Sequence, residues 1–436
     1  MALRGPFCFR YRLDQAQPNP IETAILRLNT CLLPGSRDFM ISIAPKPHLS
    51  SVFFLLLSLL TPSLHADTTD IPATQPAIGA EGAETGETEP AAASAVPLLL
   101  LGKEIPPGQI ARLAWQPQIM FSGIQVPTPV LVVHGAQPGP VQCLTAAIHG
   151  DELNGTEIVR RIMYDIDPQK LHGTVIGIPI VNLQGFERGS RYLSDRRDLN
   201  RYFPGTPLGS MASRVAHSLF TEVIAHCNGL IDLHTASFHR TNLPQVRADM
   251  HNPAVAMYTE GFERMVVVHN AGGTGTLRRA AVNAGINAVT LETGEPQRLQ
   301  EDKVQAGIAA IFSLLKHQKM YVPNFSRGNP QPIYYRSRWV RTQHGGILMS
   351  SIKLGGRVKE GEILGTVVDP ISNHTEPVIS PYSGRIIGMA VNQVVMPGFA
   401  AYHVGLEASE KILSIPEENV DTASDDEINE QLAPEE

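Results

Sequence analysis

Apolar runs that alternate with helical patterns over residues 141–317 constrain the fold of this chain most strongly. Runs of strand length occupy 141–148, 173–181, 229–233 and 288–291. Segments with helical periodicity occupy 156–165, 209–226, 275–283 and 301–317. Strands that alternate with helices are joined by crossover connections, which place helices on both faces of the sheet. The sequence therefore predicts an α/β domain over 99–325, built on a mixed but mostly parallel sheet.

The segments on either side of this alternation predict β structure of another kind. Runs broken by Pro and Gly cover 109–115, 126–129 and 129–134, and they indicate antiparallel strands at one edge of the sheet. From residue 329 onward, short runs are punctuated by glycine, which is typical of a small all-β domain. We expect that domain to span 329–412.

An apolar segment near the start of the chain indicates export. Ser51–Leu60 is too short to cross a bilayer as a helix, but it has the length of a signal-peptide core. Counted from Met40, it follows a lysine-bearing region and precedes a plausible cleavage site after Ala66. We therefore expect residues 1–39 to lie upstream of the true start, 40–66 to be a signal peptide, and the mature protein to be periplasmic without a stable membrane span. An uncleaved segment that anchors the protein in a membrane is the alternative.

Two further segments are too polar to fold on their own. Residues 67–98 are rich in Ala, Glu, Thr, Gly and Pro, which predicts a disordered linker. Residues 413–436 contain nine acidic residues and no basic one, which predicts a solvated acidic tail. The net charge of -7 and the lack of a basic stripe argue against a nucleic-acid partner. Nothing in the sequence indicates an oligomeric state.

The cysteines allow a disulfide without requiring one. Cys8 and Cys31 precede Met40, so Cys143 and Cys227 remain in the expected mature chain. A disulfide between these two would need an oxidising compartment. Because each lies in or beside an apolar run, we expect core packing to be the role of both.

Polar residues follow several of the predicted strands at their carboxyl ends. His149 comes after the strand 141–148 and Glu152 lies one helical turn further on, while His234 and Glu292 each follow a strand of their own. In an open α/β sheet, ligands bind outside the carboxyl ends of the strands. We therefore expect these four side chains to converge on one crevice.

Two imidazoles and a carboxylate make up the ligand set of a catalytic zinc site that keeps one position for water. The sequence thus predicts His149, Glu152 and His234 as ligands of one Zn²⁺ per chain. Because zinc lowers the pKa of bound water, a carboxylate that does not bind the metal must take up its proton, and Glu292 suits that role. The alternative is structural: Asp151 and Asn154 would cap the following helix, and the histidines would be ordinary polar residues at strand ends.

An arginine-rich loop follows another strand end. It contains five arginines, namely Arg188, Arg191, Arg196, Arg197 and Arg201. A guanidinium matches a carboxylate with two parallel hydrogen bonds, so such a loop at the rim of the crevice indicates an anionic substrate. A solvated loop, partly neutralised by Asp195 and Asp198, is the alternative.

Four motifs in order give the chain a resemblance to the succinylglutamate desuccinylase/aspartoacylase family, whose catalytic domain is similar to that of zinc carboxypeptidases. They are His-Gly-Asp-Glu-x-x-Gly at 149–155, Asp-Leu-Asn-Arg at 198–201, Asp-Leu-His-Thr at 232–235 and Leu-Glu-Thr-Gly at 291–294. The resemblance covers roughly residues 99–317.

The resemblance assigns roles to individual residues. It implies that His149, Glu152 and His234 bind zinc and that Glu292 is the general base and acid. Asn200 and Arg201 would hold the free carboxylate of the substrate. An upstream arginine would polarise the scissile carbonyl; Arg191 is favoured for this over Arg196 and Arg197. Arg278 is a weaker candidate for substrate contact.

The β domain resembles the small barrel that follows the catalytic domain in this family, and also a biotinyl/lipoyl module. Residues 356–365 and 380–384 carry this likeness. No Met-Lys-Met sequence lies between them, so covalent lipoylation or biotinylation is not expected. We expect the domain to wall the cleft. Tyr382 would reach the site or, as the favoured alternative, pack in a turn.

The expected function is that of a zinc-dependent hydrolase which cleaves the amide bond of an N-acyl amino acid or a similar small carboxylate by metal-activated water. A zinc carboxypeptidase that acts on cell-envelope peptides is the alternative, favoured by the signal segment. A non-catalytic binding protein with the same pocket is a third interpretation. The sequence specifies neither the acyl group nor the amino acid of the substrate.

Overall fold

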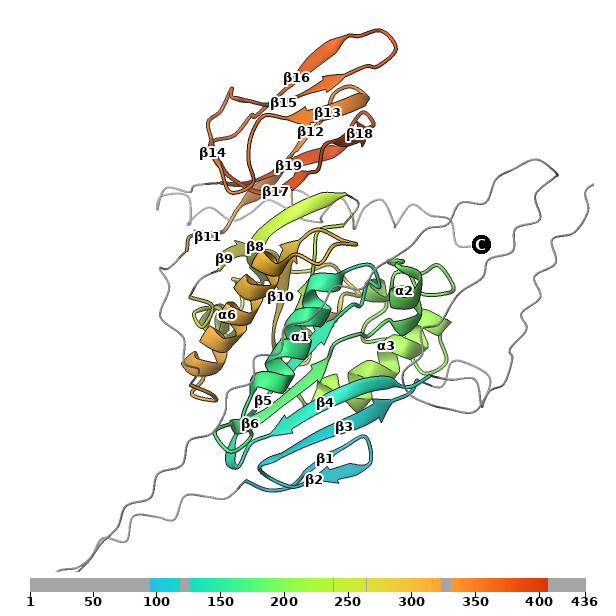
Figure 1. Cartoon of the computed structure of the whole chain (residues 1–436), viewed down its shortest axis with the longest axis vertical. Helices are drawn as coiled ribbons and strands as arrows, with labels where there is room; N and C mark the ends of the chain where they lie inside the picture. The colour runs from blue at the N-terminus through green and yellow to red at the C-terminus, as the bar shows by residue number, and fades with distance from the viewer. Residues whose placement is uncertain (1–94, 118–125, 238, 264, 323–330, 407–436) are drawn as a thin grey trace, which may run out of the picture. The chain divides into compact units, whose positions relative to one another are not determined.

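The computed structural model describes residues 95–117, 126–237, 239–263, 265–322 and 331–406 (Figure 1). The expected signal peptide at 40–66, the acidic tail at 413–436 and most of the linker at 67–98 lie outside the described residues. Within the described ranges, no helix combines the length and the apolar character needed to span a membrane.

In the α/β domain, strands and helices alternate along most of the chain. Its helices are α1 (Leu153–Asp165), α2 (Leu183–Arg188), α3 (Met211–Glu222), α4 (Pro253–Thr259), α5 (Leu277–Asn283) and α6 (Glu301–His317), with two short 3-10 turns, η1 (Leu199–Arg201) and η2 (Ile224–His226). Its strands are β1 (Leu98–Leu100), β2 (Lys103–Ile105), β3 (Gln109–Trp115), β4 (Thr128–His134), β5 (Gln137–Ala146), β6 (His172–Ile178), β7 (Gly229–His234), β8 (Arg240–Ala248), β9 (Val266–His269) and β10 (Asn287–Gly294).

The central sheet of this domain is mixed, as predicted. Strands β6, β5, β7 and β10 are parallel neighbours in that order. Antiparallel strands flank them, with β4 and β3 on one side and β8 on the other. The parallel strands are buried on both faces, which explains their almost continuous apolar runs. Of the antiparallel edge strands predicted before residue 135, those at 109–115 and 129–134 are confirmed as β3 and β4, whereas 126–129 is not a separate strand because its last two residues begin β4.

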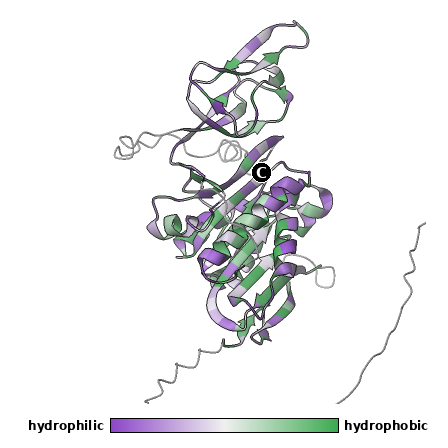
Figure 2. Cartoon of the chain, turned by 60° about the vertical axis from the view of Figure 1, so that its left-hand side comes forward, coloured by the Kyte–Doolittle hydropathy of each residue, from purple (hydrophilic) through white to green (hydrophobic). Residues whose placement is uncertain are grey.

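Helices cover both faces of this sheet, and each face has its own core. On one face, α1, α4 and α6 pack against residues such as Leu144 and Leu291. On the other face, α3 and α5 pack against Leu230 and Ala288. In α1, the buried positions Ile158, Val159, Ile162 and Met163 recur at the helical period. Figure 2 shows apolar residues concentrated along the strands, with polar and apolar residues mixed along the helices.

Several predicted boundaries differ from the structure at the ends of elements. The strand predicted at 141–148 ends at Ala146, and the helix predicted from 156 begins at Leu153. Glu152 is therefore the N-cap residue of α1, in an extended conformation and without a side-chain capping bond. β8, β9, α2 and α4 were not predicted from the sequence. In β8, Pro244 and the many polar residues mask the strand pattern.

The C-terminal β domain is built from two sheets. Its strands are β11 (Ile333–Tyr334), β12 (Ser337–Arg341), β13 (Gly346–Ser350), β14 (Arg357–Val358), β15 (Ile363–Val368), β16 (Thr375–Ile379), β17 (Gly384–Ala390), β18 (Gln393–Val395) and β19 (Ala400–Leu406). One sheet has the order β16-β15-β13-β18, and the other continues the central sheet because β17 pairs with β8. In addition, β11 pairs with β9. The β domain is thus joined to the α/β domain by backbone hydrogen bonds.

Cys143 and Cys227 form a disulfide, with their Cα atoms 5.9 Å apart. Both residues are buried in the core on the α3 and α5 face. Both cysteines thus lie in the core, as expected, and the disulfide that the sequence left open is formed. Apolar surroundings are equally typical of a buried disulfide. A single sequence does not report the distance between two cysteines, so the pattern could not distinguish the two roles.

Candidate active site

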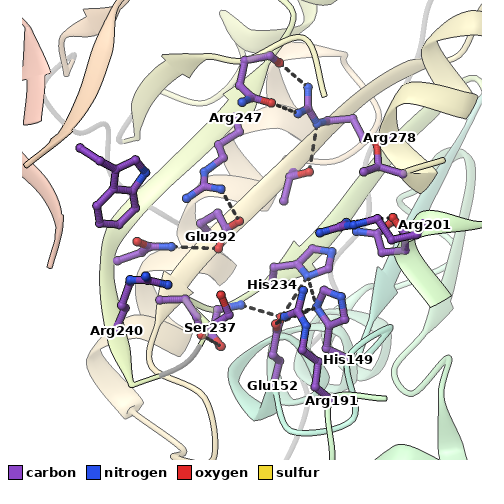
Figure 3. Close-up of a pocket in the computed structure, with 18 residues that line it drawn as sticks. His149, Glu152, Arg191, Arg201, His234, Ser237, Arg240, Arg247, Arg278 and Glu292 are labelled. Carbon is purple, nitrogen blue, oxygen red and sulfur yellow. Dashed lines mark hydrogen bonds and ion pairs between the residues drawn. The ribbon is translucent and has the colours of Figure 1, made fainter. Parts of the chain in front are cut away.

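Three predicted metal ligands converge in one buried cluster. The Nδ1 atoms of His149 and His234 lie 3.2 Å apart. The two carboxylate oxygens of Glu152 lie 2.8 Å from the Nδ1 atom of His149 and 2.9 Å from that of His234. All three side chains are almost completely buried. Figure 3 shows the three side chains pointing toward one another from β7 and from the start of α1.

Two glycines allow this convergence. A Cβ atom on Gly155 would lie 2.9 Å from the Cβ of Leu233, so its absence lets the first turn of α1 rest directly on β7. A Cβ atom on Gly150 would lie 2.1 Å from the backbone of Gly185, so only glycine fits beside α2. The turn between β5 and α1 can therefore hold His149 and Glu152 next to the end of β7. These glycines explain two positions of the first motif.

Each histidine ligand is held by a carboxylate through its other ring nitrogen. The Nε2 atom of His149 lies 3.0 Å from Asp198, and that of His234 lies 2.9 Å from Asp232. The hydroxyl of Thr145 donates to Asp232 as well. Such carboxylate partners fix the ring orientation and make the imidazole a better metal ligand. Neither role was predicted from the sequence, although Asp232 lies two residues before His234 on the same strand and so on the same face.

The charges of the cluster depend on one another. Burial opposes ionisation of Glu152, but the neighbouring histidines more than offset this and hold its pKa well below the usual range. Burial also opposes protonation of His234, whereas Asp232 and Glu152 raise its pKa well above the usual value. Burial and Arg191 lower the pKa of His149, but Asp198 and Glu152 outweigh them and raise it overall. The cluster therefore favours a positive charge between its carboxylates.

The donor set fits a zinc ion. Two imidazole nitrogens and one carboxylate are the protein ligands of a catalytic zinc site. A tetrahedral ion with ligands at roughly 2.0–2.2 Å sets its donor atoms about 3.3–3.6 Å apart. The donor atoms of His149, Glu152 and His234 already lie within 4.8 Å of one another, with the closest contacts at 2.8–3.2 Å. The donor atoms therefore lie close enough together to share one ion, at separations slightly shorter than those of a tetrahedral zinc site.

The structure distinguishes Arg191 from Arg196 and Arg197, the other two candidates for the arginine at the scissile carbonyl. Arg191 is buried, lines the pocket and lies with its Nη1 atom 3.4 Å from Glu152 and its Nη2 atom 2.9 Å from Asp198. Arg197 is largely exposed and pairs with Asp195, and Arg196 is exposed as well. Of these three candidates, Arg191 is the one beside the ligand cluster, and its role at the scissile carbonyl stays a prediction.

Asn200 and Arg201 also line the pocket. The amide oxygen of Asn200 accepts a hydrogen bond from the backbone N–H of Leu277, at the first residue of α5. This bond orients the Asn200 side chain so that its NH₂ group is the donor for a ligand. The Nη1 atom of Arg201 donates to the carbonyl of Asn200, and its Nη2 atom lies 4.0 Å from Asp198. Both residues thus lie in the pocket, and their assignment to the substrate carboxylate stays a prediction.

Arg278 lines the same pocket but is anchored on three sides. Its guanidinium donates to the backbone carbonyl and the side-chain oxygen of Asn270, at 2.5 and 2.6 Å, and to the hydroxyl of Thr290 at 3.1 Å. These bonds place a fixed positive charge in the wall of the pocket. Its assignment to substrate contact stays a prediction.

Glu292 lies in the pocket with both carboxylate oxygens held from β8. Asn242 donates to Oε2 at 3.0 Å, and Arg247 lies 3.3 Å from Oε1. The sequence analysis did not find these two partners, because β8 was not recognised as a strand. Together they orient the carboxylate beside the ligand cluster (Figure 3).

The β domain contributes one side chain to the pocket. Trp339 of β12 is among the lining residues, whereas Tyr382 packs against the core of the β domain. This agrees with the favoured alternative for Tyr382 and with the expectation that the domain walls the cleft. Little in the sequence indicated that Trp339 would line the pocket, because the residues around it do not resemble a motif.

The comparisons with known proteins agree with this geometry. Residues 138–318 match the succinylglutamate desuccinylase/aspartoacylase catalytic domain. The match includes the three ligand residues, Glu292 and the arginine-rich loop. Residues 138–318 are therefore a catalytic domain of the succinylglutamate desuccinylase/aspartoacylase type. The matched domain is a catalytic domain of deacylating enzymes, which supports an enzymatic role.

One curated relative and several solved structures are similar to this chain. The N-alpha-acetyl-L-2,4-diaminobutyric acid deacetylase of Halomonas elongata is 24% identical over 263 residues, covering 57% of this chain and 76% of the relative. The succinylglutamate desuccinylase/aspartoacylase structure from Rhodobacter sphaeroides aligns with a TM-score of 0.62 and 22% identity, over 69% of this chain and 96% of that chain. The product-bound ectoine utilization protein EutE (DoeB) from Ruegeria pomeroyi aligns with a TM-score of 0.63 and 21% identity, over 70% and 98%. These structural likenesses establish the shared fold.

Proposed function

We propose that this chain is a zinc-dependent deacylase that hydrolyses the amide bond of an N-acyl amino acid with a free carboxylate. One observation carries the proposal: His149, Glu152 and His234 converge in a single pocket with Glu292 and with arginines that suit an anionic substrate. The family and the deacetylase from Halomonas elongata support the same type of reaction.

Each residue then has a defined task. His149, Glu152 and His234 would hold the zinc ion, which, when bound, supplies Lewis acidity and lowers the pKa of a water molecule. Glu292 takes the proton of the attacking water on its carboxylate and passes it to the departing amine. Asn242 and Arg247 keep that carboxylate oriented throughout.

The arginines and Asn200 bind and orient the substrate. The guanidinium of Arg201 and the NH₂ group of Asn200 receive the free carboxylate, since a planar fork matches a carboxylate with two hydrogen bonds. Arg191, next to the ligand cluster, stabilises negative charge that develops on the carbonyl oxygen of the scissile amide. Because the arginine is held by Asp198, little reorganisation is needed during the reaction.

A carboxypeptidase that acts on cell-envelope peptides is the second candidate. The disulfide favours it indirectly, because the disulfide supports an exported protein.

We also propose that the mature protein is exported, in agreement with the signal segment that begins at Met40. Disulfides persist in oxidising compartments such as the bacterial periplasm, and the Cys143–Cys227 bond supports that location. Cell fractionation of the expressed chain tests it, and recovery in the cytosol would contradict export.

The decisive experiment combines metal analysis with a substrate panel. We expect the purified chain to contain one zinc per chain, and to hydrolyse acyl amino acids faster than peptides. Glu292→Gln should lower activity by about 10²- to 10⁴-fold while zinc is retained. Glu295→Gln, three residues later and not part of the pocket lining, is the matched control. Full activity in Glu292→Gln, or cleavage of peptides only, would refute the proposal.

A further inference from the structure

A second group of metal-ligating side chains lies outside the pocket, at the ends of β8 and β9. These two strands are parallel neighbours, with Ala248 paired to His269 (Figure 1). Asp249 follows the last residue of β8, His251 lies two residues further on, and His269 is the last residue of β9. Each of the three side chains offers a ligand atom, and these atoms lie within 4.8 Å of one another. The group therefore has the donor composition of the ligand cluster, namely two imidazoles and one carboxylate.

Local contacts already hold these three side chains close together. The Oδ1 atom of Asp249 accepts a hydrogen bond from the backbone N–H of His251 at 3.2 Å, within the turn after β8. The ring centres of His251 and His269 lie 4.2 Å apart, and the ring planes are tilted by 43°. Because the side chains are brought together before an ion arrives, little conformational entropy is lost when it binds.

Two groups of the chain compete with an ion for these ligands. The guanidinium of Arg279 lies 3.2 Å from the Oδ2 atom of Asp249, in a pair that is partly solvent-exposed and therefore weak. The backbone N–H of Met250 donates to the Nδ1 atom of His269 at 3.0 Å. Neutral imidazole has one acceptor nitrogen, so an ion bound at either ring nitrogen replaces that hydrogen bond. Binding thus displaces one exposed ion pair and one hydrogen bond of modest net strength, and we expect a moderate affinity.

The donor set and its exposure select the class of ion. Imidazole nitrogens suit zinc, copper and nickel, whereas magnesium and calcium prefer carboxylate, carbonyl and water oxygens. His251 is exposed, and Asp249 and His269 are partly exposed, so water can complete the coordination shell. We therefore expect this group to exchange its ion with the solvent more readily than the buried ligand cluster does.

The second group adjoins the wall of the pocket. Asn270 follows His269 directly, lines the pocket and accepts two hydrogen bonds from the guanidinium of Arg278. Arg279, the partner of Asp249, follows Arg278 in α5. An ion held by Asp249 and His269 would therefore lie next to two chain connections that lead to pocket-lining residues.

We propose that Asp249, His251 and His269 form a second metal site, which binds Zn²⁺ or a similar late first-row divalent ion reversibly. The inference goes beyond the proposed function and does not rest on it, because none of the three ligands lines the pocket. The bound ion links the turn after β8 to the end of β9 and steadies the segment that carries Asn270.

Metal analysis of the full chain tests the proposal. The probe is Zn²⁺ at micromolar concentration, with magnesium in excess to occupy exposed carboxylates. As purified, the parent should retain one ion per chain, and equilibrium dialysis against zinc should add a second. After dialysis, His251→Asn should lack this second ion, while His149→Ala, a variant of the ligand cluster, should still bind it. His226→Asn, an exposed histidine on η2 outside both groups, is the matched control and should bind as many ions as the parent.

Two further measurements distinguish the second site from the ligand cluster. A chromophoric chelator should remove zinc from the dialysed parent in two phases, and the faster phase should be missing from His251→Asn, because the second site is the exposed one. Added zinc should raise the melting temperature of the parent more than that of His251→Asn, since an ion that binds only the folded chain stabilises it.

Equal numbers of bound ions in the parent and His251→Asn, or the same loss in His226→Asn, would overturn the second site and leave the deacylase proposal intact. If the parent contains no ion as purified and its only ion after dialysis is lost in His251→Asn, the second site is supported and the deacylase proposal fails. Because the His251 side chain is exposed, its replacement should not disturb folding, and the comparison with the parent stays decisive even if His149→Ala does not fold.

Discussion

Glu292 and His234 are direct neighbours, in register on the parallel strands β10 and β7. Paired residues on adjacent strands project from the same face of a sheet, so the proposed general base lies beside a proposed metal ligand. The two residues are far apart in the chain, and the pairing of two central, buried strands holds them together. The catalytic arrangement thus depends on the register of the sheet more than on any loop.

Asn242→Ala should lower kcat while leaving KM and zinc content close to those of the parent. Asn242 donates to Oε2 of Glu292, so its loss leaves the carboxylate held only at Oε1 by Arg247. We expect a fall in kcat of about tenfold, because one hydrogen bond to a charged group is removed. Steady-state kinetics measure the effect. Thr241→Ala, one residue away on the opposite face of β8, serves as the control, and an equal loss in both variants would contradict a positioning role.

Asp232→Asn should weaken zinc binding by about 10- to 100-fold. The carboxylate of Asp232 holds the Nε2 atom of His234, and an amide holds the ring less firmly and contributes no charge. Competition with a chelator of known affinity measures the change. Asp302→Asn, on α6, is the control because Asp302 is exposed and pairs with Lys303 outside the ligand cluster. Unchanged zinc affinity in Asp232→Asn would show that the ligand does not need this partner.

Replacing both Cys143 and Cys227 by serine should lower the free energy of unfolding by about 2–4 kcal/mol. The bond closes a loop of 84 residues, and opening it gives the unfolded chain more conformational freedom. Urea unfolding with and without a reductant measures the effect. The reductant should destabilise the parent and leave the double variant unaffected. Equal sensitivity of the two proteins to the reductant would indicate that the disulfide is not formed in solution.

Arg161→Met should lower the thermal stability at neutral pH, and the difference from the parent should shrink in acid. A hydrogen bond from Arg161 lowers the pKa of Glu301 to about 2 from its usual value of 4.5, and this pair joins α1 to α6. A carboxylate whose pKa is lowered by folding adds stability above its unfolded pKa and loses it as the pH falls toward the folded value. The effect is small because the pair is solvent-exposed.

Melting temperatures measured between pH 7 and pH 3 test this dependence. Arg160→Met is the control, because Arg160 pairs only with Glu157 of its own helix and does not join two elements. A difference between Arg161→Met and the parent that stays constant down to pH 3 would show that Arg161 acts through packing of its side chain and not through the ion pair.

Much of the α/β domain could be predicted because its central strands and helices follow strong local rules. The helix at Glu301–His317 and the strand at Gln109–Trp115 were predicted with their observed bounds, since both have regular periodicity. The strand β8 was missed because Pro244 and several polar residues interrupt its pattern. Those polar residues include Arg240, Asn242 and Arg247, which line the pocket, so the residues that obscured the strand are the ones that form the site.

The sequence by itself identified the proposed ligand residues, the proposed general base and the strands after which they lie, because a motif at a strand end is local information. Only the tertiary structure decided which arginine lies beside the ligands, that Cys143 bonds to Cys227, and that Asn242 and Arg247 hold Glu292. Each of these facts depends on the distance between side chains far apart in the chain. That distance is set by strand pairing and core packing, which no local pattern encodes.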